Sequence, residues 1–144
     1  LQQLAAELGQ ANPQAARLVL RCHGVDEPRL VDAQLVRHVL VNLLSNALKY
    51  SSPPAPVVCT ASADGATLRL EIADRGIGIP AEDLPRLFQT FHRGANVGNI
   101  QGTGIGLHIV KECVELHQGR IEVESVQGEG TTFHVHLHAP LAPA

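Results

Sequence analysis

The clearest candidate for chemistry in the sequence is the stretch "DRGIGIP" at residues 74–80, which places an aspartate before two glycines one residue apart. A simple turn needs one glycine at most, because a single residue with positive φ is usually enough to reverse a chain. Gly76 and Gly78 together therefore indicate that the backbone must lie close to another group. Taken alone, Asp74 would still be interpreted as a turn residue.

A second glycine cluster, "GTGIG" at residues 102–106, lies between a stretch rich in glycine and asparagine (92–102) and a segment with helical spacing. The first N–H groups of a helix lack internal partners and carry the positive end of the helix dipole, and glycines let a phosphate approach the backbone. The cluster therefore predicts a phosphate site. Neither a Walker A loop nor a dinucleotide fingerprint fits, since no glycine is followed by lysine and Leu107 stands where the fingerprint requires glycine.

A polar stripe on a predicted helix strengthens this interpretation. One face of that helix carries four polar residues at intervals of four, four and three, namely His38, Asn42, Asn46 and Lys49. Asparagine is a poor helix former whose amide requires hydrogen-bond partners, so two on one stripe need an explanation. From this helix alone, a solvated face explains the stripe as well as a binding face does.

Hydrophobic periodicity and turn signals predict the elements that position these residues. Asp32 is a suitable N-cap for a long helix with paired apolar residues from Leu35 to Leu48, which must end before "SSPPAP" at 51–56. Further helices are predicted at 1–12, 80–91 and 103–118, the last capped by Gly119. Strands are predicted at 16–23, 29–31, 57–63, 66–73, 120–126 and 131–138. This order predicts an α/β (α+β) two-layer sandwich, with helices packed on one face of a mixed, mainly antiparallel sheet.

Composition limits the possible partners. The 144 residues are the size of one domain with one core. A formal net charge of −3, without a run of lysines and arginines, argues against nucleic-acid binding. The longest apolar stretches fall far short of the roughly 20 residues that span a bilayer, so the fragment is expected to be soluble. Cys22, Cys59 and Cys113 are expected to be buried or half-buried thiols in a reducing compartment.

Four stretches resemble, in order and spacing, the N, G1, F, G2 and G3 boxes of the catalytic and ATP-binding domain of sensor histidine kinases, which has the GHKL or Bergerat fold. They are "NLLSNALKYSSP", "DRGIGIP", "LFQTFHRG" and "GTGIGLHIVKECVELHQGRIEVESVQGEGTTF". The resemblance implies that residues 1–144 are one such domain. Residues 1–12 would be a first helix or a linker from a dimerisation domain, and 92–101 would be the ATP lid.

The resemblance also implies how adenine would be recognised. Asp74 would accept a hydrogen bond from the adenine amino group, and Thr131 would assist through a water. Gly76, Gly78 and Ile79 would place their loop against the base.

The polar stripe would bind the metal and the phosphates. Asn46 would be the protein ligand of Mg²⁺, for which its amide oxygen is a hard, neutral donor. Lys49 would contact phosphate as a point charge, and Tyr50 would flank the nucleotide. Related ATPases usually carry a glutamate at the position of Asn42 to activate water. An amide cannot act as a general base at neutral pH, so hydrolysis is expected to be slow, and the expected catalytic residues are Asn42, Asn46 and Lys49.

The lid and the G2 box would surround the phosphates. The implied contacts of the G2 box are Gly102, Thr103, Gly104, Gly106 and Leu107. His92 and Arg93 are candidate phosphate contacts, although an arginine on a loop is most often just solvated. Phe88 and Phe91 are expected to pack at the base of the lid or against a partner domain.

The function implied is that of a protein-histidine kinase that transfers the γ-phosphoryl of Mg²⁺·ATP to a histidine on a dimerisation domain absent from this chain. A response regulator receiver domain would take the phosphoryl group next. The fragment is expected to be monomeric and cytoplasmic and the full-length protein a homodimer, with membrane anchoring of the parent left open. Two alternatives remain: a nucleotide-hydrolysing relative, which Asn42 disfavours, and a non-catalytic nucleotide-binding module.

Three features fall outside this pattern. Arg75 stands where the family often has asparagine or an acidic residue, and His108 stands where a small residue is common, so nucleotide affinity or lid packing is expected to differ. "HVHLH" places His134, His136 and His138 on one face of a strand, a possible metal site for an ion such as Zn²⁺. The favoured interpretation is that Phe133, Val135 and Leu137 face the core while the histidines face water.

Overall fold

The computed structural model describes residues 18–23, 30–51, 55–82, 84, 88 and 105–140. The predicted first helix at 1–12 and the predicted lid at 92–101 lie outside the described residues. The elements in chain order are β1 (Leu18–His23), α2 (Ala33–Tyr50), β2 (Val57–Asp64), β3 (Thr67–Asp74), α3 (Ile105–Leu116), β4 (Arg120–Val126) and β5 (Gly130–His138).

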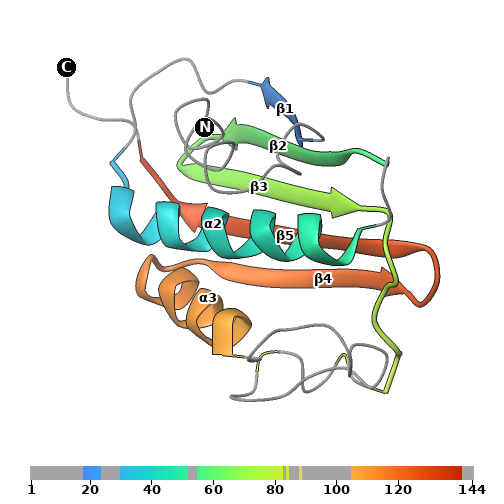
Figure 1. Cartoon of the computed structure of the whole chain (residues 1–144). Coiled ribbons are helices and arrows are strands. Elements are labelled where there is room, and N and C mark those ends of the chain that lie inside the picture. Colours follow the sequence, from blue (N-terminus) through green and yellow to red (C-terminus); the bar gives the residue numbers. More distant parts are fainter. Residues whose placement is uncertain are drawn as a thin grey trace.

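The five strands form one sheet in the order β1-β2-β3-β5-β4. The β1–β2 pair is parallel, whereas the pairs β2–β3, β3–β5 and β4–β5 are antiparallel. Helices α2 and α3 lie over the same face of this sheet (Figure 1). The predicted two-layer α/β fold with a mixed, mainly antiparallel sheet is therefore confirmed.

Helix α2 begins and ends where the sequence predicts. The Asp32 side chain accepts hydrogen bonds from the backbone N–H groups of Gln34 and Leu35, at 3.0 and 3.2 Å, and so satisfies two of the donors that a helix start leaves free. The helix ends at Tyr50, and the N–H group of Ser51 still donates to the Ala47 carbonyl. The proline-containing segment that follows prevents the helix from continuing.

The core lies between the two helices and the sheet. The paired apolar residues of α2 are buried, as are the inward residues of the strands, and the largest fully buried side chains include Leu43, Leu44, Ile72, Val110, Val135 and Leu137. Phe133 is buried too, which confirms the prediction that Phe133, Val135 and Leu137 of β5 face the core. Cys59 and Cys113 are buried as expected, but Cys22 is exposed, because it lies on the edge strand β1, which has one strand neighbour.

Three local predictions were wrong. Leu30 and Val31 are not in a strand, because Leu30 makes a single backbone hydrogen bond, to Pro140, instead of a ladder. Within the predicted helix at 80–91, none of the described residues is α-helical, and Leu84 lies in a 3₁₀ turn. Two prolines in that segment explain the difference, since Pro85 lacks an N–H group and disfavours the α conformation of the residue before it.

The end of α3 also differs from its prediction. The left-handed residue after the helix is Gln118, with φ of 56°, rather than Gly119. The N–H group of Gly119 donates to Val114 and that of Gln118 to Glu115, which is a Schellman motif shifted by one residue. Glycine is required at 119 for another reason, since a Cβ there would collide with the carbonyl oxygen of His136.

Candidate functional site

Three segments that are far apart in the sequence meet at one end of the sheet, where β3 ends. They are the end of α2, the loop after β3 and the β4–β5 turn (Figure 1). Ser51 and Gly76 pair in an isolated antiparallel bridge, and the N–H group of Ile77 donates to the Tyr50 carbonyl at 3.2 Å. On the other side of the loop, the N–H group of Gly128 donates to the Ile77 carbonyl at 2.7 Å. The loop after β3 is therefore held by backbone hydrogen bonds on both sides.

The two glycines of "DRGIGIP" are required by these approaches. A Cβ on Gly76 would collide with the Tyr50 carbonyl oxygen, and a Cβ on Gly78 would collide with the Val126 carbonyl oxygen. Gly78 also has a left-handed φ of 69°, which side chains rarely adopt. The sequence correctly indicated that the backbone lies close to another group, and that group is the backbone of the protein itself. Contact of this loop with a base stays a prediction.

Asp74 is a half-buried acidic residue at this end of the sheet. It is the last residue of β3 and pairs with Thr131 of β5. Burial raises the pKa of its carboxyl from 3.8 to about 6, while hydrogen bonds from the backbone N–H groups of Thr131 and Gly76 lower it. Asp74 is therefore a half-buried carboxylate, and with a pKa of about 6 it is mostly ionised at pH 7.

Ser125 lies at the same end of the sheet, and the sequence interpretation missed it. Its hydroxyl accepts a hydrogen bond from the N–H group of Ile79 at 2.8 Å and lies 3.0 Å from the Gly130 carbonyl and 2.8 Å from the Thr131 hydroxyl. It thus links the loop after β3 to the start of β5. A signal was present, because Ser125 follows Ile121 and Val123 on the inward face of β4, where alternation predicts an apolar residue.

The polar stripe of α2 borders the core rather than forming a fully solvated face. Asn42 is half-buried and its amide nitrogen donates to the His38 carbonyl at 2.7 Å. Asn46 is also half-buried, and within the described residues its amide has no hydrogen-bond partner. Lys49 is exposed, with its Nζ 5.8 Å from the centroid of the Tyr50 ring. Tyr50 connects the stripe directly to Gly76, so the structure brings the N-box and G1-box residues together.

Of the residues predicted in the G2 box and the lid, Gly106 and Leu107 lie in α3, where Leu107 is half-buried. His92, Arg93, Gly102, Thr103 and Gly104 lie outside the described residues, as does Phe91.

The base of the predicted lid packs on the core. Phe88 contacts Phe133 edge to face, with ring centroids 6.4 Å apart. His108 joins this contact to α3, since its Nδ1 lies 3.2 Å from the Phe88 carbonyl and its Nε2 lies 3.0 Å from the Glu112 carboxylate. The unusual residue at 108 therefore affects the packing of Phe88.

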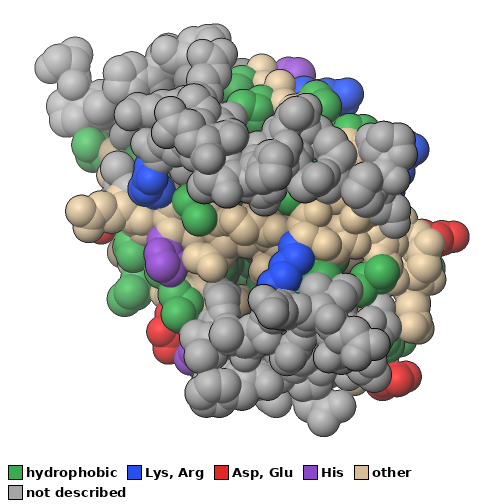
Figure 2. Space-filling view, in the orientation of Figure 1, with side chains coloured by type: hydrophobic (Ala, Val, Ile, Leu, Met, Phe, Trp, Pro, Cys, Tyr) green, Lys and Arg blue, Asp and Glu red, His purple; other side chains and the backbone are tan. Residues whose placement is uncertain are grey.

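The remaining predictions concern surfaces. On the face seen in Figure 2, lysine and arginine side chains of the described residues are spread over several places rather than gathered in one basic patch. His138 is exposed and His134 and His136 are half-buried; among the residues that the structure describes, no group of three histidine, cysteine or acidic side chains is arranged to hold a metal ion. No helix in the described part of the chain has the length and apolar character needed to cross a membrane.

The α/β sandwich is the fold of a class of ATPases, and comparison with known proteins identifies the family. Residues 31–141 match the family described as histidine kinase-, DNA gyrase B-, and HSP90-like ATPase. The chain belongs to this family and is the catalytic and ATP-binding domain of a sensor histidine kinase.

Several similar curated proteins are named as histidine kinases. The circadian input-output histidine kinase CikA of Synechococcus elongatus is 41% identical over 106 residues, which are 72% of this chain and 14% of that protein. The histidine protein kinase DivJ of Caulobacter vibrioides is 38% identical over 113 residues, 78% of this chain and 19% of that protein. The sensor histidine kinase WalK of Bacillus subtilis is 39% identical over 107 residues, 72% and 18% of the two chains. The chain thus spans less than a fifth of the length of these relatives.

Solved structures agree with this assignment. A mycobacterial sensor histidine kinase, MprB, has a TM-score of 0.79 at 26% identity, with 98% of this chain and 97% of that chain covered. Full-length ShkA in complex with AMPPNP has a TM-score of 0.78 at 27% identity, with 99% of this chain and 30% of that chain covered.

Proposed function

We propose that this chain binds Mg²⁺·ATP at the end of the sheet where the end of α2, the loop after β3 and the β4–β5 turn meet. It donates the γ-phosphoryl group to a histidine on a dimerisation domain of the same parent protein, and an aspartate of a response regulator receiver domain then takes it. The observation that carries this proposal is the half-buried Asp74 carboxylate with its two backbone donors. The sensor histidine kinases among the relatives and the AMPPNP complex of ShkA support it.

Adenine recognition follows from the state of Asp74. With a pKa of about 6, its carboxyl is mostly ionised at pH 7 and acts only as an acceptor. The N–H groups of Thr131 and Gly76 favour its ionised form, in which the carboxylate can accept several hydrogen bonds. The exocyclic amino group of adenine is a donor that suits this acceptor, whereas the carbonyl of guanine in the same place would be repelled. The half-buried site strengthens this discrimination, because a carboxylate that loses its partner there is poorly solvated.

Asn46 fits the proposed magnesium ligand. Its half-buried amide has no hydrogen-bond partner among the described residues, so its oxygen is available for a hard cation. When bound, the ion would neutralise phosphate charge. Lys49 lies one turn closer to Asp74 and has no carboxylate partner in the described part of the chain, which leaves its ammonium available for phosphate. The proposed contacts from Tyr50, His92, Arg93 and the G2 box would complete the phosphate site.

Asn42 supports phosphoryl transfer over hydrolysis. Its amide nitrogen is occupied by the His38 carbonyl, and its remaining oxygen is a neutral acceptor that cannot remove a proton from water at pH 7. The residues of this stripe therefore position and neutralise the phosphates without activating a water molecule. In this proposal the domain is monomeric and cytoplasmic, and the parent protein is a homodimer.

Titration calorimetry with ADP and AMPPNP, with and without Mg²⁺, tests the nucleotide site. We expect Asp74→Asn to weaken ADP binding about 100-fold, because an acceptor for the adenine amino group becomes a donor. Asp64→Asn is the matched control at the opposite end of the sheet and is expected to leave binding unchanged. Asn46→Ala is expected to remove only the Mg²⁺-dependent part of AMPPNP affinity. Equal ADP affinities for the Asp74 and Asp64 variants would contradict the site.

Phosphoryl transfer is tested separately, by adding a histidine-bearing dimerisation domain and radiolabelled ATP. Label on that domain, lost in Asp74→Asn, is the expected result. Nucleotide binding without label on any dimerisation domain from the parent protein would contradict the kinase proposal and favour a non-catalytic nucleotide module. Release of free phosphate in its place would favour a hydrolase.

A further inference from the structure

The sheet face turned away from α2 and α3 carries a row of basic side chains. Arg69 of β3 pairs with His136 of β5, and His136 pairs with Arg120 of β4. Their neighbours Leu70 and Leu137 point into the core, so the alternation of each strand places the row on the opposite face. Directly opposed residues have Cβ atoms about 5 Å apart, so the two arginines flank His136 from the strands on either side. The strand register therefore gathers three basic side chains on this face.

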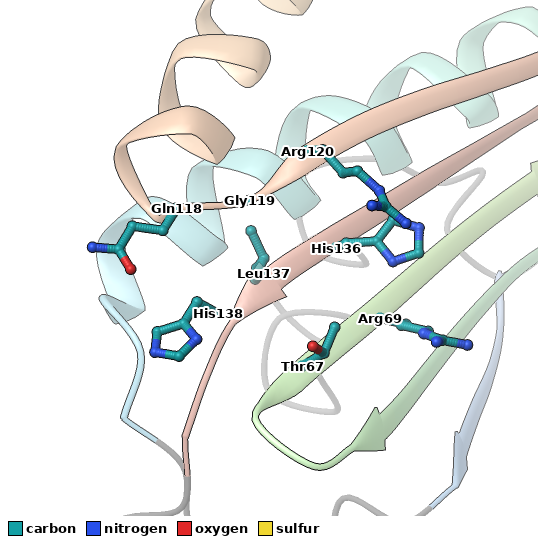
Figure 3. A pocket seen from close by; sticks show the side chains of 8 residues that line it. All are labelled: Thr67, Arg69, Gln118, Gly119, Arg120, His136, Leu137 and His138. Carbon is teal, nitrogen blue, oxygen red and sulfur yellow. The ribbon is translucent and has the colours of Figure 1, made fainter.

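The row borders a hollow of about 360 Å³. Figure 3 shows the Arg120 guanidinium beside the His136 ring, with Thr67 and Arg69 on the neighbouring strand and Gln118 and His138 across from them. Within the described part of the chain, no acidic residue lines this hollow. The hydroxyl of Thr67 and the amide of Gln118 have no hydrogen-bond partner among the described residues, which leaves additional donors available.

Each arginine of the row has one acidic neighbour, and neither of these two acids lines the hollow. Arg120 Nε lies 3.1 Å from Glu122, and Arg69 Nη2 lies 3.9 Å from Asp64; all four side chains are more than half exposed. Exposed pairs of this kind contribute little. Burial lowers the pKa of His136 most; Arg120, Arg69 and His134 lower it further, and Glu122 raises it. Among the described residues, the lining of the hollow itself includes two arginines and two histidines and no carboxylate.

We propose that this hollow binds a doubly charged oxyanion of the phosphate class, with the two arginines supplying charge and His136 donating a hydrogen bond. A planar guanidinium matches two oxygens of such an anion. The site is distinct from the proposed nucleotide site. Thr67 and Asp74 are the two ends of β3, and seven steps along a strand span about 23 Å.

The histidine ring signals of the isotope-labelled chain, followed by NMR at constant ionic strength, test the proposal. Inorganic phosphate, sulfate and glycerol 3-phosphate are titrated, with sodium chloride as the reference and saturating ADP present in a parallel series. We expect the His136 signal to shift along a saturable curve with the three oxyanions and to remain in place with chloride. Because a bound dianion favours the protonated ring, the pKa of His136 is also expected to rise.

Arg120→Gln is expected to weaken this binding about tenfold, by removing one charge-assisted contact. Lys111→Gln is the matched control, since it removes one positive charge from an exposed position of α3, and it is expected to leave the binding curve unchanged. Both variants are expected to bind ADP as the wild type does, which separates this test from that of the nucleotide site. Tighter binding of phosphate would identify a free anion as the ligand, and tighter binding of glycerol 3-phosphate would identify a phosphorylated small molecule. Non-saturable shifts, equal effects of the two variants, or loss of the shifts when ADP is present would overturn the proposal.

Discussion

The two ends of the sheet are constructed differently. At the end that carries Asp74, backbone contacts backbone: the loop after β3 lies against Tyr50 on one side and Val126 on the other, with glycine where a Cβ would collide. The end that carries Arg69 and Arg120 has one such backbone approach, of Gly119 to the His136 carbonyl, and beside it a hollow lined by long, charged side chains that are mostly exposed. The loop at the first end is thus fixed by backbone contacts on both sides, whereas the hollow at the second end is lined by charged side chains that can be replaced without disturbing the backbone.

The largest effect that this comparison predicts is at Gly76. Gly76→Ala is expected to lower the free energy of unfolding by about 3 kcal/mol or more, because the methyl group forces Tyr50 and Ser51 away from the loop. Gly65→Ala is the control: φ is 59° there, but no atom lies within 4 Å of the added Cβ, so a loss of about 1 kcal/mol is expected. Chemical denaturation measures both. A smaller loss for Gly76→Ala than for Gly65→Ala would contradict the tight contact.

A smaller loss is expected at Ser125. Ser125→Ala leaves the part-buried N–H group of Ile79 without its acceptor, which should cost about 2 kcal/mol of stability. Because the same hydroxyl lies 2.8 Å from Thr131, ADP affinity should fall about tenfold as well. Ser62→Ala on β2 is the control, because it removes a half-buried strand hydroxyl far from the Asp74 end of the sheet. It is expected to change stability and ADP affinity less than Ser125→Ala does. Wild-type ADP affinity in Ser125→Ala would limit Ser125 to a structural role.

The pH dependence of stability tests Asp74 itself. Its folded pKa of about 6 lies above the ordinary 3.8, so the protonated carboxyl stabilises the fold below pH 3.8 and this contribution is lost as the pH rises through 6. Relative to Asp74→Asn, the wild type should lose about 1–2 kcal/mol between pH 4 and 7, a value reduced for the partial exposure of the group. Thermal denaturation across this range measures the difference, and a constant difference would contradict the raised pKa.

The smallest effect is expected at the opposite end. Asp64→Asn removes the partner of Arg69 from an exposed pair at 3.9 Å and should change the free energy of unfolding by less than about 0.5 kcal/mol. A loss above 1 kcal/mol, measured by the same denaturation experiment, would show that the charges at this end contribute to the fold as the glycines do at the other.

Local sequence signals predicted the long elements of the fold well. The capped and paired pattern of α2 and the alternation of β3 and β5 specify both the type of element and its buried face. The failures are short segments. Leu30 and Val31 have strand-like residues but only one backbone partner, and Gln118 adopts the left-handed conformation expected of its neighbour Gly119 because that glycine is needed against His136. In each case a contact distant in sequence outweighs the local preference.

The sequence by itself determined the helix stripe with Asn42 and Asn46, the alternating strands, and the order of the boxes, because periodicity and capping depend on residues close together in the chain. Only the tertiary structure decided that Gly76 and Gly78 serve contacts with Tyr50 and Val126, or that Ser125 links two loops. It also decided that two arginines far apart in the sequence stand beside His136. Those relations depend on the pairing of strands and on backbone approach across the sheet, which the chain establishes only when it has folded.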